Sequence, residues 1–138
     1  MREIIFRGKT LCHEEWEYGN LIILASLDNY MMIERNKEFV EKTGRYSTAV
    51  VVPETVGQYT GLKDKNDDRM WEGDIVKGLF YHERPVLAVV KFKDGAFGLE
   101  WDRSGAKTFS AFTSLCNIQY EKLGNIFDNP ELLETNEQ

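Results

Sequence analysis

The chain has 138 residues, of which 42% are hydrophobic and 29% charged, and its formal net charge is −6 at pH 7. This composition excludes intrinsic disorder and allows a core that needs neither metal nor disulfide. No apolar run approaches the about 20 residues of a membrane-spanning helix, and the N-terminus lacks the apolar stretch of a signal peptide, so we expect a cytoplasmic protein that enters no membrane.

The first half of the chain predicts a series of strands separated by turns. Gly19 and Asn20 suit a turn or bulge within the second strand, and Pro53 ends the fourth because proline cannot donate to a ladder. In chain order we expect a strand over Ile4, Phe6 and, after a turn at Gly8, Leu11, a strand over Trp16–Leu24, a strand over Tyr30–Ile33, a turn at Asn36 and Lys37 before Glu38–Glu41, and a strand over Ala49–Val52.

The stretch QYTGLKDKNDDRMWEGDIVKG, residues 58–78, combines aromatic, glycine, lysine and acidic side chains. Residues 58–60 and 71–77 have the composition of strands. The polar residues between them are rich in Asn and Asp, whose side chains cap turns and tolerate left-handed backbone. We therefore predict two strands and a turn, followed by a bend at Gly73 where Asp74 holds nearby amides.

The clearest hairpin joins Val86–Phe92 to Ala96–Trp101 through Asp94-Gly95, a dipeptide that supplies the positive φ angles of a tight turn. Alternation places Lys91 and Lys93 on the same face as Glu100, while apolar residues share the other face. We expect this element to form an antiparallel pair.

The end of the chain predicts one more strand and two short helices. Apolar residues at helical spacing favour a helix over Thr108–Cys116, and Ile118–Leu123 favours a strand. The ending GNIFDNPELLE predicts a terminal helix with Asn129 as its N-cap and Pro130 in its first position. That helix should dock through Leu132 and Leu133.

The most metal-like pattern is Asp64, Asn66 and Asp68, which stand at positions one, three and five of an EF-hand loop. Arg69 stands where that loop needs glycine, and Ile75 stands where it needs the closing glutamate. We therefore expect a solvated turn there and no metal ligand.

No other pattern assembles a catalytic or cofactor site. His13 and His82 lack the spacing of metal ligands or of a positioned base, and no phosphate-binding glycine pattern occurs. Glu72 and Asp74 could share a strand face and serve acid–base chemistry, but exposed strands commonly look the same. We expect no catalytic residue and no cofactor.

A binding role for the 58–78 stretch would involve the side chains of Tyr59, Lys63, Lys65, Trp71 and Asp74. Tyr59 and Trp71 are candidates for stacking on bases, and the two lysines are candidates for phosphate contacts. The acidic net charge disfavours nucleic acid, yet residues 63–124 are neutral overall, so nucleic-acid binding stays open.

Several segments resemble the YopX family of phage and prophage proteins. The likeness rests on residues 58–78 and on GNIFDNPELLE, and it extends to REIIFRGK, WEYGNLII, VVPETVGQYTG and FKDGAFGLEW. Asp67 stands where many members have glycine, which makes positive φ less accessible there. The resemblance implies a phage or prophage gene, a predominantly β fold and action in the bacterial cytoplasm, and it supplies no reaction, cofactor or catalytic residue.

These observations predict a single, mainly β domain over residues 1–138. An N-terminal β portion covers residues 1–57, and residues 58–138 form a small bent sheet or SH3-like barrel with the terminal helix. The leading functional hypothesis is a non-enzymatic module that binds an unknown protein partner or itself. The alternatives are a nucleic-acid-associated module and an enzyme that uses Glu72 and Asp74.

Overall fold

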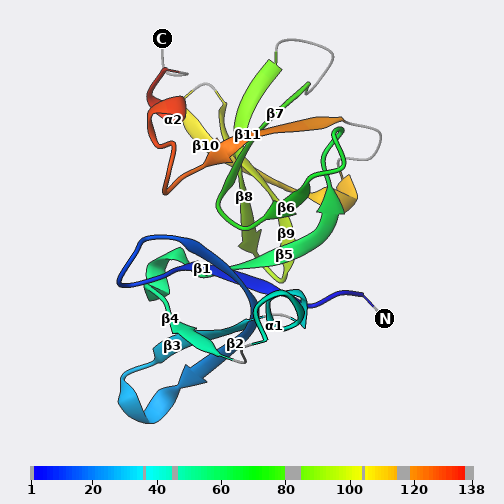
Figure 1. Cartoon of the computed structure of the whole chain (residues 1–138). Coiled ribbons are helices and arrows are strands. Elements are labelled where there is room, and N and C mark those ends of the chain that lie inside the picture. The colour runs from blue at the N-terminus through cyan, green and yellow to red at the C-terminus, as the bar shows by residue number, and fades with distance from the viewer. Residues whose placement is uncertain are drawn as a thin grey trace. The chain divides into compact units, whose positions relative to one another are not determined.

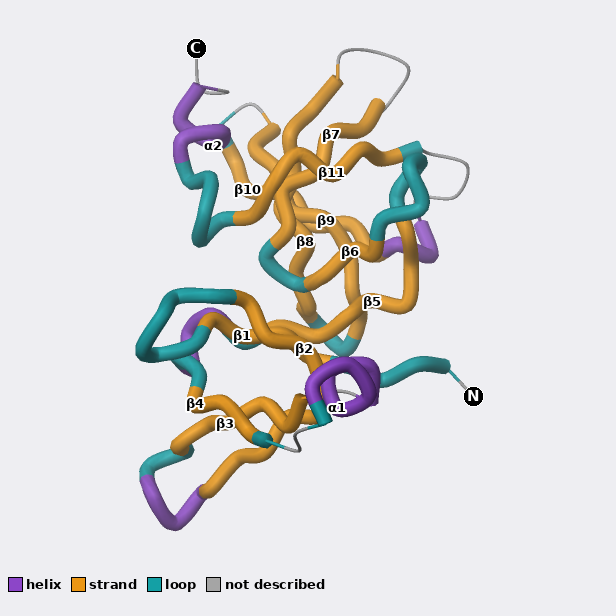
Figure 2. Tube along the Cα trace, viewed as in Figure 1, coloured by secondary structure: helices purple, strands orange, loops and turns teal. Residues whose placement is uncertain are grey.

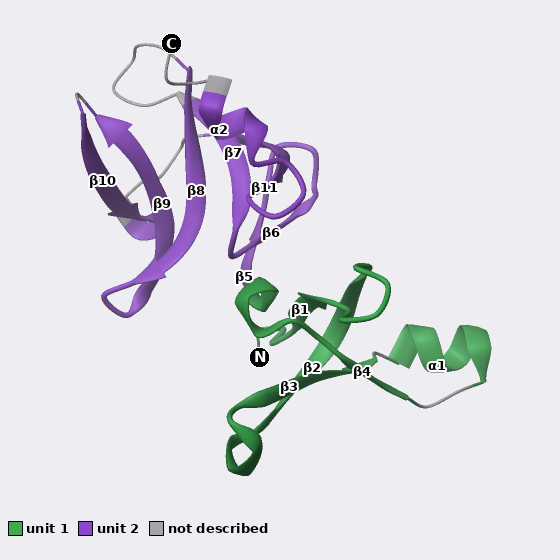
Figure 3. Cartoon of the chain, turned by 90° about the vertical axis from the view of Figure 1, so that its left-hand side faces the viewer, with its two compact units in different colours: residues 1–59 green, residues 60–138 purple. Residues whose placement is uncertain are grey.

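The computed structural model of the chain describes residues 2–35, 37–44, 47–79, 85–103, 105–114 and 119–135. The chain divides into two compact units, residues 1–59 and 60–138 (Figure 3). The predicted portions 1–57 and 58–138 meet close to this division. That the whole chain is one domain stays a prediction.

Unit 1 is built on antiparallel strands in the order β4-β3-β2-β1-β5 (Figure 1). Its strands and helices are β1 (Phe6–Lys9), β2 (Trp16–Leu24), the 3-10 helix η1 (Ala25–Leu27), β3 (Tyr30–Arg35), α1 (Lys37–Thr43), β4 (Thr48–Val50), the 3-10 helix η2 (Pro53–Thr55) and the start of β5 (Gly57–Lys63). Ile33, Ala49 and Val51 are buried in this unit.

Three local predictions for unit 1 are wrong. Gly8 lies within β1, opposite Glu17, and forms no turn. β2 continues through Gly19 and Asn20 without a turn, pairing with β1 up to Gly19 and with β3 from Gly19 onward. Glycine is needed there because a Cβ would overlap the carbonyl oxygen of Glu34. Lys37 begins α1 instead of a turn, and the ion pair between Lys42 and Glu38 at 2.8 Å supports that helix. Asn36 lies outside the described residues.

Unit 2 contains a five-stranded antiparallel sheet in the order β10-β9-β8-β7-β11 (Figure 2). β5 continues into this unit, where β6 pairs with it. The elements are β6 (Arg69–Trp71), β7 (Asp74–Leu79), β8 (Pro85–Lys93), β9 (Ala96–Arg103), β10 (Ala106–Ala111), the 3-10 helix η3 (Phe112–Ser114), β11 (Tyr120–Asn125) and α2 (Glu131–Thr135). The mainly β fold and the terminal helix are confirmed. The sheet order starts at β10 and ends at β11, so the described residues form an open sheet.

The predicted β8–β9 hairpin is confirmed. Asp94 and Gly95 have φ angles of 51° and 82°, as the tight turn requires. The Phe92 and Phe97 rings meet edge to face with centroids 5.0 Å apart. Around this hairpin the core of unit 2 consists of Met70, Val76, Ala88, Val90, Leu99, Trp101 and Tyr120.

The helix predicted over Thr108–Cys116 is wrong in its first half. Residues 108–111 belong to β10, where Thr108 lies opposite Trp101 and Ala111 lies opposite Gly98. Pairing with β9 overrides the helical spacing of the phenylalanines, and only η3 is helical. Leu115, Cys116 and Ile118 lie outside the described residues.

Candidate functional site

Residues 58–78 form the predicted strands and turn. Between β5 and β6 the backbone reverses, with the Asp64 amide donating to the Asp68 carbonyl at 2.8 Å and the Asp67 amide donating to the Asp64 carbonyl at 3.0 Å. Asp67 has a φ of 66°, so aspartate adopts the left-handed conformation for which glycine is better suited. The departure from glycine therefore does not prevent the turn.

The carboxylate of Asp64 organises this turn. Its Oδ1 accepts from the amides of Asn66 and Asp68, each at 2.9 Å, and its Oδ2 accepts from the Lys122 amide at 2.9 Å. Desolvation raises the pKa of Asp64, but hydrogen bonds from the amides of Lys122, Asp68 and Asn66 and the charge of Lys122 outweigh it and lower the pKa. Both oxygens that Asp64 would offer to calcium in an EF-hand are thus used by backbone donors.

The same turn covers one edge of the five-stranded sheet. Besides the bond from Lys122 to Asp64, the Lys65 amide donates to the Tyr120 carbonyl at 2.8 Å. Both contacts fall on β11, the last strand in the sheet order. The polar turn therefore satisfies backbone groups that an edge strand would otherwise leave open.

Glu72 and Gly73 form the second turn, between β6 and β7, and Asp74 begins β7. Gly73 has a φ of 89°, and the buried Asp74 accepts from the Trp71 amide at 2.7 Å through Oδ2. Lys122 donates to the Arg69 carbonyl at 2.9 Å while its Nζ lies 4.0 Å from Asp74 Oδ2. Asp74 therefore holds an amide, as predicted.

The predicted binding surface comprises Tyr59, Lys63, Lys65, Trp71 and Asp74, and only the two lysines are exposed. Tyr59, Trp71 and Asp74 are buried, with 6%, 4% and 1% of their surface exposed, so their side chains are not available to stack on bases or meet a partner in this conformation. Lys63 and Lys65 are exposed. They pair with Asp67 at 3.5 Å and with Glu121 at 3.1 Å, respectively.

A cavity of about 760 Å³, here named the β8–α2 groove, lies elsewhere in unit 2. Ala88 and Val90 point into the core, so the alternating Leu87 and Val89 face the opposite side of the sheet. There they form the apolar wall of the groove, and Ile126 and Leu133 of the C-terminal segment also line it. Its volume falls within the range of about 300–1,000 Å³ that is usual for ligand sites.

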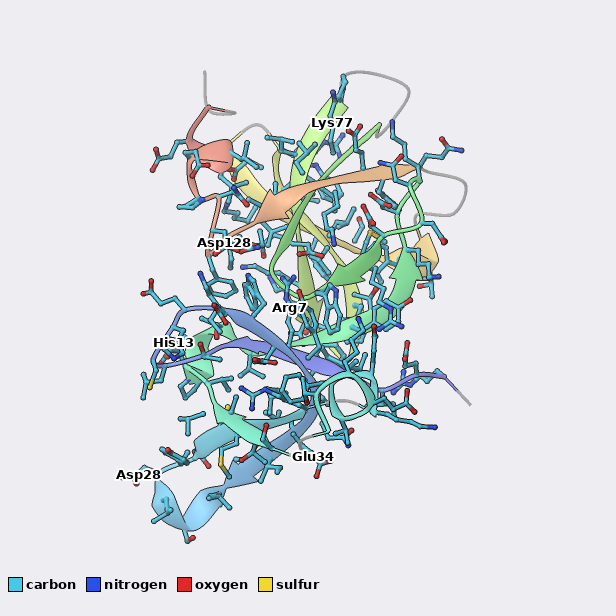
Figure 4. All side chains as sticks on the ribbon, in the orientation of Figure 1. Arg7, His13, Asp28, Glu34, Lys77 and Asp128 are labelled. Atoms are coloured by element: carbon cyan, nitrogen blue, oxygen red, sulfur yellow. The ribbon has the colours of Figure 1, made fainter. Side chains whose placement is uncertain are left out.

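Backbone contacts hold the C-terminal wall of the groove in place. The Ile126 amide donates to the Gly73 carbonyl at 2.9 Å. Asn125 Oδ1 accepts from the amides of Phe127 and Asp128, both at 2.9 Å, and Figure 4 labels Asp128 in this segment. The side chain of Asn129 accepts from the Asn125 amide at 3.2 Å and so closes this turn, while α2 begins at Glu131, one residue after the predicted start at Pro130.

One end of the groove is charged. Glu100 accepts from Lys91 at 2.9 Å and pairs with Lys93 at 3.1 Å, as the predicted alternation requires. The pKa of Glu100 is lowered. The hydrogen bond from Lys91 is the largest cause and Lys93 adds to it, and together they outweigh desolvation, which raises the pKa. Lys107 lies 3.5 Å from Asp102 on the same rim. The charged residues that line the groove balance, Lys91 and Lys107 against Glu100 and Asp102, and Lys93 beside them adds one positive charge.

Sequence reasoning missed this groove. The available signal was a second apolar row, Leu87 and Val89, on the hairpin face opposite the core. A strand that is apolar on both faces predicts that both faces are covered. The covering residues Ile126 and Leu133 come from a segment distant in sequence, so the pattern of β8 alone could not place them.

Among the described residues, no group of three or more His, Cys, Asp or Glu side chains is placed to hold a metal ion. No helix in the described ranges is long and apolar enough to cross a membrane.

Two antiparallel β units, the second with a groove beneath its terminal helix, define a mainly β protein. Residues 5–134 match the family model described as YopX protein, and the chain belongs to the YopX family. The crystal structure of protein EF1440 from Enterococcus faecalis is similar in fold, with a TM-score of 0.56 and 24% sequence identity over 96% of this chain and 99% of that chain. No curated protein matches the chain.

Proposed function

We propose that the chain is a phage- or prophage-encoded accessory protein of the bacterial cytoplasm that acts without catalysis, by binding a segment of a partner protein in the β8–α2 groove. Membership of the YopX family supports the phage origin. The groove carries the binding proposal, because it combines apolar walls with a charged rim on the β8–β9 hairpin.

The chemistry of the groove favours a segment with aliphatic anchors and acidic flanks. Leu87, Val89 and Leu133 offer an apolar wall on which aliphatic side chains gain by leaving water. Lys91 and Lys93 share the single carboxylate of Glu100, so an acidic side chain of the partner meets excess positive charge there. The rest of the acidic chain repels such a segment, which directs it to this end.

Selection of random peptides displayed on yeast, followed by titration of purified peptides, tests this proposal. We expect selected peptides to combine aliphatic and acidic residues, and Leu133→Glu to weaken their binding at least 10-fold. Leu123→Glu, which places the same charge at an exposed leucine of β11, is the matched control. Equal binding by the two variants, or no selected peptide that contacts the groove, would refute the groove as the binding site.

A further inference from the structure

An apolar hairpin of unit 1 lies outside any core. We call residues 21–32 the β2–β3 arm; they comprise the end of β2, η1 and the start of β3 (Figure 1), and none of them is buried. Ile23, Leu27 and Tyr30 are 49%, 60% and 41% exposed. Asp28 lies at the tip (Figure 4), where it has a φ of 53°. Ile23 lies opposite Met31 and Leu24 lies opposite Tyr30, so the arm exposes apolar side chains on both of its faces.

One side of the arm is an open strand edge. β1 pairs with β2 only from Trp16 to Gly19, so residues 21–24 have β3 on one side and no paired strand among the described residues on the other. Ile23 lies opposite Met31, and the Met31 carbonyl accepts from the Val51 amide at 3.1 Å. The Met31 carbonyl thus points toward Val51 and away from β2, so Ile23 and Met31 form a non-hydrogen-bonded pair.

The alternation of antiparallel pairs then fixes which groups face the open edge. In a non-hydrogen-bonded pair, the N–H and C=O groups of each residue point away from the strand that it is paired with. The N–H and C=O of Ile23 therefore face the open side of β2. Leu21, two residues earlier and opposite Ile33, presents its groups in the same direction. The open edge is therefore a short row of donors and acceptors spaced for another strand.

The edge has none of the features that normally prevent strand association. Residues 21–24 are Leu-Ile-Ile-Leu, without lysine, proline or any charge, and such apolar edges pair readily. A two-stranded ribbon is only marginally stable by itself. An added strand would satisfy the open backbone groups.

We propose that the open edge of β2 pairs antiparallel with the same edge of a second copy of the chain. Leu21 would lie opposite Ile23 of the second copy, and the backbone N–H and C=O groups of both residues would form hydrogen bonds across the interface. Ile22 would lie opposite Ile22 of the second copy, on the two-fold axis. This isologous arrangement is the commonest in homo-oligomers. The edge suits identical copies because it is uncharged, whereas the chain as a whole carries −6 and repels itself elsewhere.

Cysteine cross-linking tests the register in full-length protein in which Cys12, which is free and exposed, and Cys116 are replaced by serine. Ile22→Cys should form a disulfide-linked dimer under mild oxidation, because directly opposed non-hydrogen-bonded residues lie about 4.5 Å apart at Cα, within the span of a disulfide. Leu24→Cys should not, because its equivalent lies too far along the partner strand. Equal cross-linking of both variants, or none in Ile22→Cys, would overturn the register.

Sedimentation velocity over a concentration series tests the association itself. Ile23→Lys introduces a charge at the paired edge and should weaken dimerisation at least 10-fold. Leu11→Lys changes another exposed aliphatic side chain of unit 1, 60% exposed, and should leave dimerisation unchanged. A wild-type chain that stays monomeric, or equal behaviour of the two variants, would overturn the proposal. Neither outcome bears on the β8–α2 groove, whose lining residues belong to unit 2.

Discussion

Replacing Asp64 by asparagine should destabilise the folded chain by about 2–4 kcal/mol at neutral pH. The amide keeps one oxygen for the Asn66 and Asp68 amides and turns its NH₂ toward the Lys122 amide, so a donor faces a donor. Hydrogen bonds to a charged group contribute about 1.5–3 kcal/mol each. The variant loses the bond from Lys122, and its bonds from Asn66 and Asp68 now end on a neutral oxygen. Asp68→Asn, an equal change of charge at an exposed position of the same turn, is the control and should change stability by less than about 0.5 kcal/mol.

The pH dependence of the difference in unfolding free energy between wild type and Asp64→Asn is a second test of the contacts of Asp64. The pKa of Asp64 is lowered from its ordinary value of 3.8, so the folded state favours the ionised carboxylate. This contribution is complete above 3.8 and is lost as pH falls through the folded-state pKa. Urea unfolding followed by tryptophan fluorescence should therefore show the gap between wild type and Asp64→Asn narrowing in acid. A variant as stable as wild type, or a gap that stays constant below 3.8, would refute the assigned role of Asp64.

Three further substitutions test the turns and the close strand approach by the same unfolding assay. Asp67→Gly should stabilise the chain by up to about 0.5–1 kcal/mol, because glycine adopts the left-handed conformation without strain, and this gain exceeds the cost of its greater entropy in the unfolded chain. A loss of stability would contradict the role given to the φ of 66° at Asp67. Gly19→Ala should cost about 3 kcal/mol or more, since the new methyl group overlaps the Glu34 carbonyl in β3, and a cost below about 1 kcal/mol would argue against this close approach. Asp74→Ala should cost about 2–3 kcal/mol by leaving the buried Trp71 amide without its acceptor, and an unchanged stability would show that this bond contributes nothing.

The sequence predicted best those elements whose cause is local. Asp94-Gly95 specifies its own turn through positive φ, and the alternation of Lys91, Lys93 and Glu100 specifies which side chains pair across the hairpin. The polar turn after β5 likewise follows from the capacity of Asp64 to accept from amides near it in sequence.

Features decided by distant residues could not be predicted in the same way. The exposure of Tyr59 and Trp71 depends on packing that their own strands do not specify, and both proved buried. The spacing of Asp64, Asn66 and Asp68 indicates a metal-like pattern, but the bond that Asp64 accepts from Lys122 comes from a strand far along the chain. β10 shows the same limit, because its pairing with β9 overrides the helical spacing of its phenylalanines.

A comparison of the strand edges on β11 and on β2 shows why the β2–β3 arm calls for a partner. On β11, a buried carboxylate and an amide of the polar turn cover the edge groups of Lys122 and Tyr120. The edge of β2 has no such cover among the described residues, although residues 21–24 form the kind of continuous apolar run that is typical of strands covered on both faces. Without a partner strand, the N–H and C=O groups of Leu21 and Ile23 stay open to water along an uncharged edge, the kind of edge at which strands of separate chains pair. The difference is explained if association itself covers the second edge.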